Sequence, residues 1–415
     1  MVKMKNSGID WIGKIPEDWK SVKFNAIYNL RTEKVSDKDF PPLSVTKKGI
    51  VPQLDTAAKT NDGDNRKLVK KGDFAINSRS DRRGSCGISR YDGSVSLINT
   101  VLFPRNSKMD PRYYDWLFHT IQFADEFYKW GHGIVDDLWT TNWQDMKNIT
   151  LILPPLSQQQ IIADFLDKKC VKIDYLYTQV QKEIDALEKY RKNIITKAIT
   201  KGLNDKVLMK DSGIEWMGKI PREWKIGKLK FFVEVQSSKK SLEDMNGRYI
   251  GLENVEKNSG KYKVSNSTYE PGIYDSCEKG DILYGKLRPN LAKVIIAPFD
   301  ACCTGEFEIL KARNFQNKWI KYYLLCDGVT KMATAATYGT KMPRVNWNFV
   351  SNLPLPIPSN DEIDKITDYL DKKTAEIDKV ILQKQKQLSL LSNYKSSLIF
   401  EYVTGKKQVL NVGEE

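Results

Sequence analysis

The chain has 415 residues, more than one hydrophobic core usually supports, so at least two domains are expected. Its 66 lysines and arginines outnumber 52 aspartates and glutamates, which gives a net charge of +14 that both halves share. This positive charge favours an elongated polyanion as partner. A generally lysine-rich composition would give a net charge of the same sign. No stretch is apolar enough to span a membrane and no secretory signal is visible, which predicts a cytoplasmic protein without a membrane partner.

A tryptophan-rich motif opens the chain and returns in its second half. SGIDWIGKIPEDWK at 7–20 is repeated as SGIEWMGKIPREWK at 212–225, and further matching pairs follow at offsets of 204 to 208 residues. They include KGD at 71–73 and 279–281, and FLDKK at 165–169 with YLDKK at 369–373. The chain is therefore a tandem duplication. The paired tryptophans are expected to be packing residues that fix the corner where the chain enters each half.

Two similar frames surround two dissimilar inserts. Short apolar runs separated by Gly, Asn and Asp turns predict inserts rich in strands, with helices at 112–130 and 317–333. The predicted organisation is an N-terminal frame at 1–20, a first domain at 21–153, a helical region at 154–204, the repeated frame at 205–225, a second domain at 226–357, a second helical region at 358–405 and a tail at 406–415.

The segment after each insert is predicted to be helical. Residues 157–169 have the spacing of a short helix with Ser157 and Gln160 as a capping box, and a longer amphipathic helix over 173–200 would measure about 42 Å. Packing of the long helices on each other as an antiparallel pair is favoured over packing of each on its own domain, although Lys384 interrupts the second apolar stripe. The expected helix-pair contacts are Ile173, Val180, Ile184, Leu187, Ile194, Ile377, Leu388, Leu391 and Leu398.

Basic and polar clusters in the inserts suit a nucleic-acid surface, because arginine and lysine bind phosphates and guanine edges. The segments at 76–85 and 284–293 both follow the KGD turn and are expected at equivalent places, as are those at 132–143 and 337–347. Each cluster alone would also fit a solvated loop, and Trp139 would also fit a core. The candidate DNA-binding residues are Lys47, Lys48, Asn77, Arg79, Arg82, Arg83, Trp139, Thr141, Lys286, Arg288, Asn290, Tyr338, Lys341 and Arg344.

No catalytic or metal-binding motif is recognised. Phosphate-binding loops, dinucleotide turns, HExxH, GxSxG and the motifs of amino-methyltransferases are all missing from the sequence. The six cysteines are scattered and only His119 and His132 could supply imidazole, so no zinc site is expected and the cysteines are predicted to be buried, reduced thiols. Binding is therefore expected rather than catalysis.

The combined pattern resembles the specificity (S) subunits of type I restriction-modification systems. The likeness rests on the twice-used SGI-W-GKIP--W opening, on LPPLSQQQIIADFLDKK with its echo LPIPSNDEIDKITDYLDKK, and on the endings YRKNIITKAIT and YKSSLIFEYVTGK. LSVTKKGIVP at 43–52 and YIGLENVEKNSGKY at 249–262 look like phrases of that family's target-recognition domains. The resemblance covers essentially the whole chain.

The resemblance implies an α+β chain with two pseudo-symmetric, β-rich, mixed α/β target-recognition domains separated by an antiparallel pair of long helices. Each domain would read one half of a split site in double-stranded DNA, while the helices set the spacer and dock two modification (methyltransferase) subunits. No cofactor is expected in this chain: the modification subunits would methylate adenine with S-adenosylmethionine. Restriction subunits, whose presence the sequence leaves open, would use ATP and Mg.

The second copy departs from this pattern where PSNDEIDKI replaces PLSQQQIIA, which puts an identical contact with both modification subunits in doubt. Two other classes stay open beside the resemblance. One is an enzyme that acts alone, and the other is a protein scaffold that binds no nucleic acid.

Overall fold

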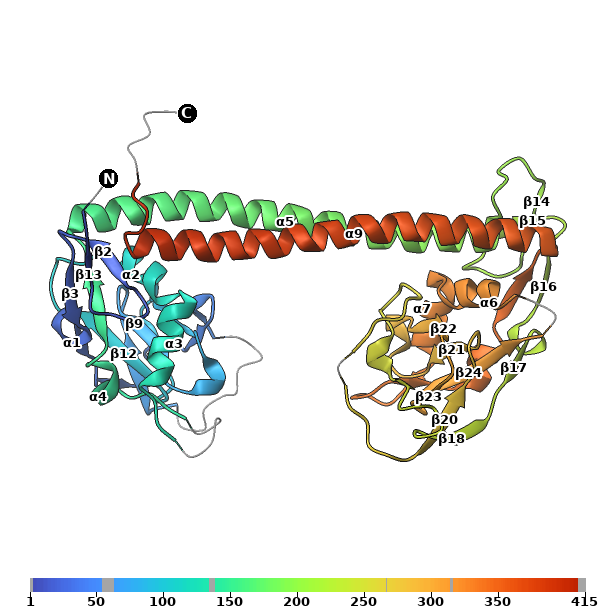
Figure 1. Ribbon diagram of the computed structural model, residues 1–415, viewed down its shortest axis with the longest axis horizontal. Helices are drawn as coiled ribbons and strands as arrows, with labels where there is room; N and C mark the ends of the chain where they lie inside the picture. Colours follow the sequence, from blue (N-terminus) through green and yellow to red (C-terminus); the bar gives the residue numbers. More distant parts are fainter. Residues whose placement is uncertain (1–2, 54–62, 134–138, 266, 314–315, 410–415) are drawn as a thin grey trace. The chain divides into compact units, whose positions relative to one another are not determined.

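The computed structural model describes residues 3–53, 63–133, 139–265, 267–313 and 316–409, and it divides into two compact units. The first unit comprises residues 1–179 and 387–415, and the second comprises residues 180–386. Each unit therefore holds one insert of the duplication together with part of both long helices (Figure 1).

The same four-stranded antiparallel sheet lies at the centre of both inserts, although their sequences have little in common. The strand order is β10-β9-β12-β4 in the first unit and β22-β21-β24-β17 in the second. The bounds are β4 Tyr28–Leu30, β9 Phe74–Asn77, β10 Cys86–Ile88 and β12 Asn99–Pro104, then β17 Val233–Val235, β21 Ile282–Gly285, β22 Val294–Ile296 and β24 Phe307–Ala312. The prediction of β-rich, mixed α/β domains is confirmed.

The inserts differ in what accompanies this sheet. The first adds a three-stranded sheet of β5 (Lys34–Val35), β8 (Arg66–Val69) and β11 (Gly93–Val95), and a hairpin of β6 (Leu43–Thr46) and β7 (Gly49–Pro52). The second adds a four-stranded sheet of β18 (Ser238–Ser241), β20 (Ile273–Cys277), β23 (Ala301–Cys303) and β19 (Tyr249–Ile250), and a pair of β25 (Thr337–Tyr338) and β26 (Arg344–Val345).

The frame segments of each unit form two-stranded antiparallel sheets. They are β1 (Met4–Asn6) with β2 (Lys14–Pro16) and β3 (Lys20–Lys23) with β13 (Thr150–Leu153) in the first unit, and β14 (Met209–Asp211) with β15 (Lys219–Pro221) and β16 (Lys225–Lys228) with β27 (Pro354–Ile357) in the second. The strand after each opening motif thus pairs with the strand that leads into the long helix.

The helices predicted at 112–130 and 317–333 are each broken into two. The first becomes α2 (Pro111–Phe118) and α3 (Ile121–Lys129), and the second becomes α6 (Asn317–Leu324) and α7 (Asp327–Ala335). Thr120 causes the first break, because its side chain accepts from Phe123 N at 3.2 Å and caps α3. The remaining short helices are α1 (Phe24–Ile27), α4 (Trp143–Met146) and α8 (Trp347–Ser351), with 3-10 turns η1 (Ser80–Arg82), η3 (Leu229–Phe231), η4 (Leu252–Asn254) and η5 (Pro289–Leu291).

The segment predicted as a short and a long helix is one continuous helix. α5 runs over Leu156–Lys201, 46 residues, and its counterpart α9 runs over Asn360–Val403, 44 residues. The expected break near residues 170–172 was wrong because Cys170, Val171 and Lys172 include no glycine or proline to end a helix. At 1.5 Å per residue, a 46-residue helix is about 69 Å long instead of 42 Å.

The start of α5 also differs from the prediction, whereas α9 starts with the expected kind of cap. Because α5 begins at Leu156, Ser157 already lies inside the helix and is not its cap. In α9, Ser359 Oγ accepts from Glu362 N at 3.4 Å, and Glu362 Oε2 accepts from Ser359 N at 3.2 Å. The capping box therefore exists only in the second copy.

Within each unit the long helices lie side by side and antiparallel (Figure 1). In the first unit Lys395 Nζ of α9 lies 2.6 Å from Asp174 Oδ1 of α5. In the second unit Arg191 of α5 pairs with Asp378 of α9, at positions that are the repeat equivalents of that first pair. The duplicated sequence therefore makes the same helix-to-helix ion pair twice.

The residues of the predicted apolar stripe are buried or half-buried. Buried positions are Ile173, Val180, Ile184, Ile377, Leu388 and Leu398, and half-buried positions are Leu187, Ile194 and Leu391. Lys384, which interrupts the stripe, places its Nζ 2.6 Å from Glu183 Oε2 on the other helix. The antiparallel helix pair is confirmed, and the lysine joins it through an ion pair.

The first opening motif fixes the end of one long helix beside the start of the other. Trp19, 1% exposed, donates from Nε1 to Gln158 Oε1 of α5 at 2.5 Å. A Cβ on Gly405, just after α9, would lie 2.5 Å from Pro16 Cδ. Only glycine allows this close approach, and Trp19 is a packing residue as predicted.

The second opening motif repeats this arrangement with the helices exchanged. Trp224, also 1% exposed, donates to Glu362 Oε1 of α9 at 3.2 Å. Gly202, just after α5, would place a Cβ 3.3 Å from the Trp224 ring. The motif occurs twice because each unit needs it to join two helix ends.

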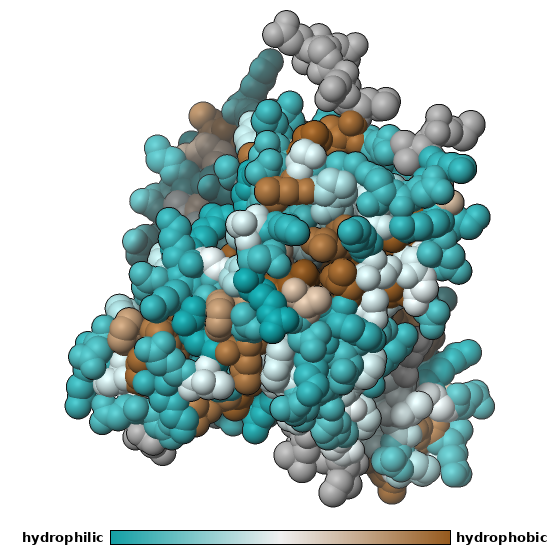
Figure 2. Space-filling model, turned by 90° about the vertical axis from the view of Figure 1, so that its left-hand side faces the viewer, coloured by the Kyte–Doolittle hydropathy of each residue, from teal (hydrophilic) through white to brown (hydrophobic). Residues whose placement is uncertain are grey.

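On the face drawn in Figure 2, hydrophobic side chains appear as groups among hydrophilic ones. Figure 2 shows one face of the molecule, on which hydrophilic residues cover most of the area between such groups. Among the residues that the structure describes, no helix is both long enough and apolar enough to cross a lipid bilayer.

Candidate nucleic-acid interface

The shared KGD motif is a structural turn that leads into the central sheet. Gly72 and Gly280 have φ of +91° and +98°, a conformation that favours glycine. Asp73 Oδ2 accepts a hydrogen bond from the N–H three residues earlier at 2.8 Å, and Asp281 Oδ2 does the same at 2.8 Å. The turn thus precedes β9 in one unit and β21 in the other, and these two strands hold the same position in their sheets. The loops that follow the two strands therefore begin at equivalent places.

In the first unit, the loop after β9 joins the segment after residue 138. Thr141 N donates to Ser78 O at 3.0 Å, and Arg79 forms a β-bridge with Thr140. The tip of the β6–β7 hairpin lies against the strand that follows this loop, because a Cβ on Gly87 would be 2.8 Å from Gly49 Cα. Lys47 and Lys48 at that tip are therefore next to the same strand.

The second unit joins its two loops in the same way. Val345 N donates to Lys286 O at 3.1 Å, and Leu287 forms a β-bridge with Arg344. Arg288 N donates to Pro343 O at 2.8 Å, and Arg288 adopts a left-handed conformation with φ of 51°. The structure thus confirms that the matching segments occupy equivalent places in the two inserts.

Seven of the candidate DNA-binding residues have exposed side chains with no ion-pair partner among the described residues. They are Lys47, Lys48 and Arg79 in the first unit, and Arg288, Asn290, Tyr338 and Lys341 in the second. Such side chains can reach phosphates or base edges without first giving up an internal partner.

Four other candidates are held by carboxylates. Arg82 Nε lies 3.4 Å from Asp81, Arg83 pairs with Asp125 and lies over the Tyr128 ring, and Lys286 Nζ lies 3.0 Å from Glu308. Arg344 donates three hydrogen bonds to Glu306, and this hydrogen bonding lowers the pKa of Glu306. These four cations differ from the first group in having a carboxylate partner within the chain.

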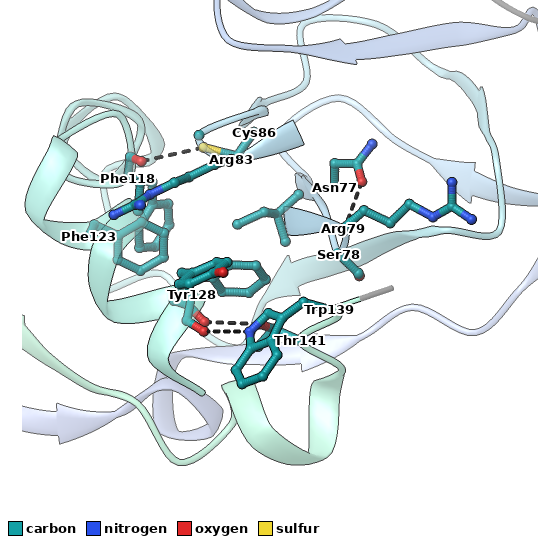
Figure 3. A pocket seen from close by; sticks show the side chains of 14 residues that line it. Asn77, Ser78, Arg79, Arg83, Cys86, Phe118, Phe123, Tyr128, Trp139 and Thr141 are labelled. Carbon is teal, nitrogen blue, oxygen red and sulfur yellow. Dashed lines mark hydrogen bonds between the residues drawn. The ribbon is translucent and has the colours of Figure 1, made fainter. Parts of the chain in front are cut away.

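The remaining three candidates are Asn77, Trp139 and Thr141, which are buried or half-buried and are labelled in Figure 3. Thr141 is 2% exposed and donates to Phe127 O at 2.9 Å, and Asn77 is 9% exposed and accepts from Arg79 N at 3.1 Å. Trp139 is half-buried, stacks on Tyr128 and donates to Tyr128 O at 3.0 Å. These contacts hold the loops together, and DNA contact by the three residues stays a prediction.

The sequence did not single out the acidic partners of the second loop cluster. Glu306 and Glu308 flank Phe307 at the start of β24, so both point to one side of the strand, and β24 pairs with β21. The alternation of Glu with Phe and Ile in TGEFEIL was the available signal, but it does not say which strand will be the neighbour.

The six cysteines are single thiols inside the protein. All six are buried and unpaired, as predicted, and burial raises the pKa of the Cys86 and Cys326 thiols. The described residues contain no group of three or more His, Cys, Asp or Glu side chains arranged to hold a metal ion.

Two equivalent loop clusters on duplicated domains, joined to a pair of long helices, match one known protein family. The sequence model of the type I restriction modification DNA specificity domain matches residues 16–189 and 221–389. The chain belongs to this specificity family. One match falls on each copy of the duplication, so both copies are specificity domains of that kind.

Curated relatives of this family resemble the chain over nearly its whole length. The EcoDI specificity subunit of a type I restriction enzyme from Escherichia coli is 22% identical, covering 95% of this chain and 90% of that protein. The MjaVIII specificity subunit from Methanocaldococcus jannaschii is 25% identical, covering 96% and 95%.

A solved structure has the same fold. One chain from a study of complex assembly and conformational transition of the type I restriction-modification system superposes with a TM-score of 0.69 at 13% identity, covering 95% of this chain and 99% of that one. The family match therefore identifies the chain as a type I restriction-modification DNA specificity subunit, and the solved structure shows the shared fold.

Proposed function

We propose that each insert domain reads one half of a split site in double-stranded DNA, while the long helices dock two modification subunits and set the spacing between the half-sites. The observation that carries this is the repeated loop cluster. Backbone hydrogen bonds join Ser78 with Thr141 and Lys286 with Val345 in the same way, but the side chains around them differ. Two domains with the same loop backbone arrangement but different side chains are suited to recognising different DNA sequences.

A domain exchange tests this proposal. Residues 21–140 are replaced by the matching segment of another specificity subunit, and methylated adenines are mapped in a genome that carries the modification genes. We expect one half of the recognised site to change and the other half to stay. A change of both halves, or of neither, would contradict independent reading.

Single arginines provide a finer test of the same loops. Arg79→Ala and Arg288→Ala each remove an exposed cation of one domain, and we expect each to relax or weaken its own half-site by ~1 to 3 kcal/mol if the side chain contacts a base. Arg82→Ala is the matched control, because Arg82 is already next to Asp81. Equal losses at all three positions would indicate a general charge effect.

Exposed apolar residues on the helices support two equivalent docking sites. Tyr190 and Tyr394 are repeat equivalents and are 56% and 57% exposed, while Leu176 and Val380 are equivalents with 49% and 39% exposure. Large apolar side chains exposed at matching positions suit two copies of one partner. The partner we propose is the modification subunit.

Subunit counting tests these docking sites. Tyr190→Ser and Tyr394→Ser should each lower the number of modification subunits bound per chain from two toward one, as measured by mass photometry of the purified complex. Lys189→Ser, an exposed neighbour on the same helix, should leave two bound. Unchanged binding in both tyrosine variants would exclude these positions as docking sites.

We propose further that this chain has no catalytic group or cofactor of its own. The modification subunits would bring S-adenosylmethionine and methylate adenine, and any restriction subunits would bring ATP and Mg. Incubation of the purified chain with DNA, S-adenosylmethionine and Mg-ATP should give no turnover, whereas adding modification subunits should give methylated adenine. Methyl transfer by the chain alone would contradict this.

A further inference from the structure

A small cavity lies under the recognition loops of the first domain. It has a volume of about 10 Å³, which is close to the space of one water molecule. Its inner walls are apolar and come from β9 and from α2 and α3, including Ile76, Phe118, Phe123 and Ala124. Its rim is formed by the loop with Asn77, Ser78 and Arg79 and by Trp139 (Figure 3).

Three polar side chains around this cavity are engaged with the protein. Thr141 Oγ1 donates to Phe127 O at 2.9 Å, and Trp139 Nε1 donates to Tyr128 O at 3.0 Å. Cys86 Sγ donates to Phe118 O at 3.4 Å. A buried water needs two to four polar partners, so a small apolar group fits the cavity better than water does.

The aromatic walls belong to the first domain. In α7, the counterpart of α3, Val329 takes the place of Phe123 and Ala333 takes the place of Phe127, and η5 packs on that helix. The two domains therefore differ in the shape of the surface directly below equivalent loops. Such a difference is suited to selecting different bases.

We propose that this cavity receives the C5-methyl group of a thymine in the first half-site. The inference rests on the proposed function, since it requires the rim to face the major groove of DNA. Thymine is the only one of the four bases that presents an apolar group there, and apolar side chains commonly contact that methyl. Arg79 at the rim, exposed and without an ion-pair partner among the described residues, can bind the neighbouring phosphate or base edge.

Base analogues test the proposal on the unmodified protein. The domain exchange identifies the half-site that is read by residues 21–140. Each thymine of that half-site is then replaced, one at a time, by deoxyuridine. Binding of the full chain with its modification subunits to each DNA is measured by fluorescence anisotropy. We expect about fourfold weaker binding at one position, because burying one methyl group contributes about 0.8 kcal/mol. 5-Bromodeoxyuridine, which is methyl-sized, should restore binding there, and the larger 5-propynyl group should weaken it.

A cavity-filling variant links that effect to this cavity. Ala124→Leu places three more carbon atoms in the space, so it should abolish the difference between thymine and uracil at that position. Thr330→Leu, at the equivalent position of α7, should keep the difference. The proposal is overturned if no thymine is sensitive, if the half-site contains no thymine on either strand, or if Ala124→Leu retains the difference.

The analogue series stands alone if Ala124→Leu fails to fold: sensitivity to deoxyuridine with rescue by bromine and loss with propynyl supports the proposal, and any other pattern overturns it. Failure of the proposed function looks different. In that case the exchange of residues 21–140 would leave both half-sites unchanged, whereas failure of the cavity proposal alone would leave that exchange effective.

Discussion

Removal of Asp378 should destabilise the second unit strongly, because it leaves a buried guanidinium without a counter-charge. The side chains of Arg191 and Asp378 are only 5% and 9% exposed, and Lys261 Nζ of the insert lies 2.7 Å from Asp378 Oδ2. Breaking a buried ion pair by removing one partner costs about 3–5 kcal/mol. We expect a loss of that size in the free energy of unfolding of this unit for Asp378→Ala.

The duplication supplies a matched control. Asp174, the repeat equivalent of Asp378, is 61% exposed and pairs with Lys395, which is 28% exposed. An exposed pair contributes about 0–1 kcal/mol, so Asp174→Ala should cost no more than that. Both substitutions remove one carboxylate from equivalent positions of the helix pair. A difference between their losses in unfolding free energy therefore reports the effect of burial.

A double variant tests the cause. Arg191→Met with Asp378→Leu removes both charges and keeps apolar volume, and it should recover most of the stability lost in Asp378→Ala. Because the two units need not unfold together, hydrogen exchange of peptides from 185–201 and 370–386 is measured beside urea denaturation. Equal losses for Asp378→Ala and Asp174→Ala, or no recovery in the double variant, would refute the reasoning.

Four further substitutions and one insertion probe the frame. Gly405→Ala should cost about 1–3 kcal/mol in thermal unfolding, because its Cβ would overlap Pro16, and Gly202→Ala should cost less because the nearest atom is 3.3 Å away. Ser359→Ala should cost about 1 kcal/mol by removing the cap of α9, while Ser157→Ala, inside α5, should be close to neutral. Four residues inserted after Glu183 and at the matching place in α9 lengthen both helices by about 6 Å, and the proposed spacing role predicts about two more base pairs between half-sites in a methylation map.

The duplicated frame could be predicted from sequence because its signals are local or repeated. The seven-residue apolar period includes Ile173 and Ile377, and both are buried in the structure. The ends of the helices were harder to predict from the sequence. Whether Pro155 or Ser157 precedes the first turn of α5 depends on the residue at which β13 ends. Element boundaries of this kind are decided by tertiary contacts.

The loop clusters could be located but not resolved into individual roles. Arg288 and Arg344 look alike in sequence, yet one is exposed and the other is bound to Glu306. That partner comes close only because β24 pairs with β21 in the observed register, with Gly285 opposite Phe307. Long-range strand register has no local signal in a single sequence.

The contacts explain why the two copies agree in the frame and differ in the inserts. Trp19 contacts the start of α5 and lies next to Gly405, two residues after α9, so a change there must suit two partners at once. The recognition loops are joined by backbone groups, Ser78 O with Thr141 N and Lys286 O with Val345 N, which different side chains leave intact. Side chains on these loops can therefore vary with little cost to folding, and this is the condition under which one scaffold can read many half-sites.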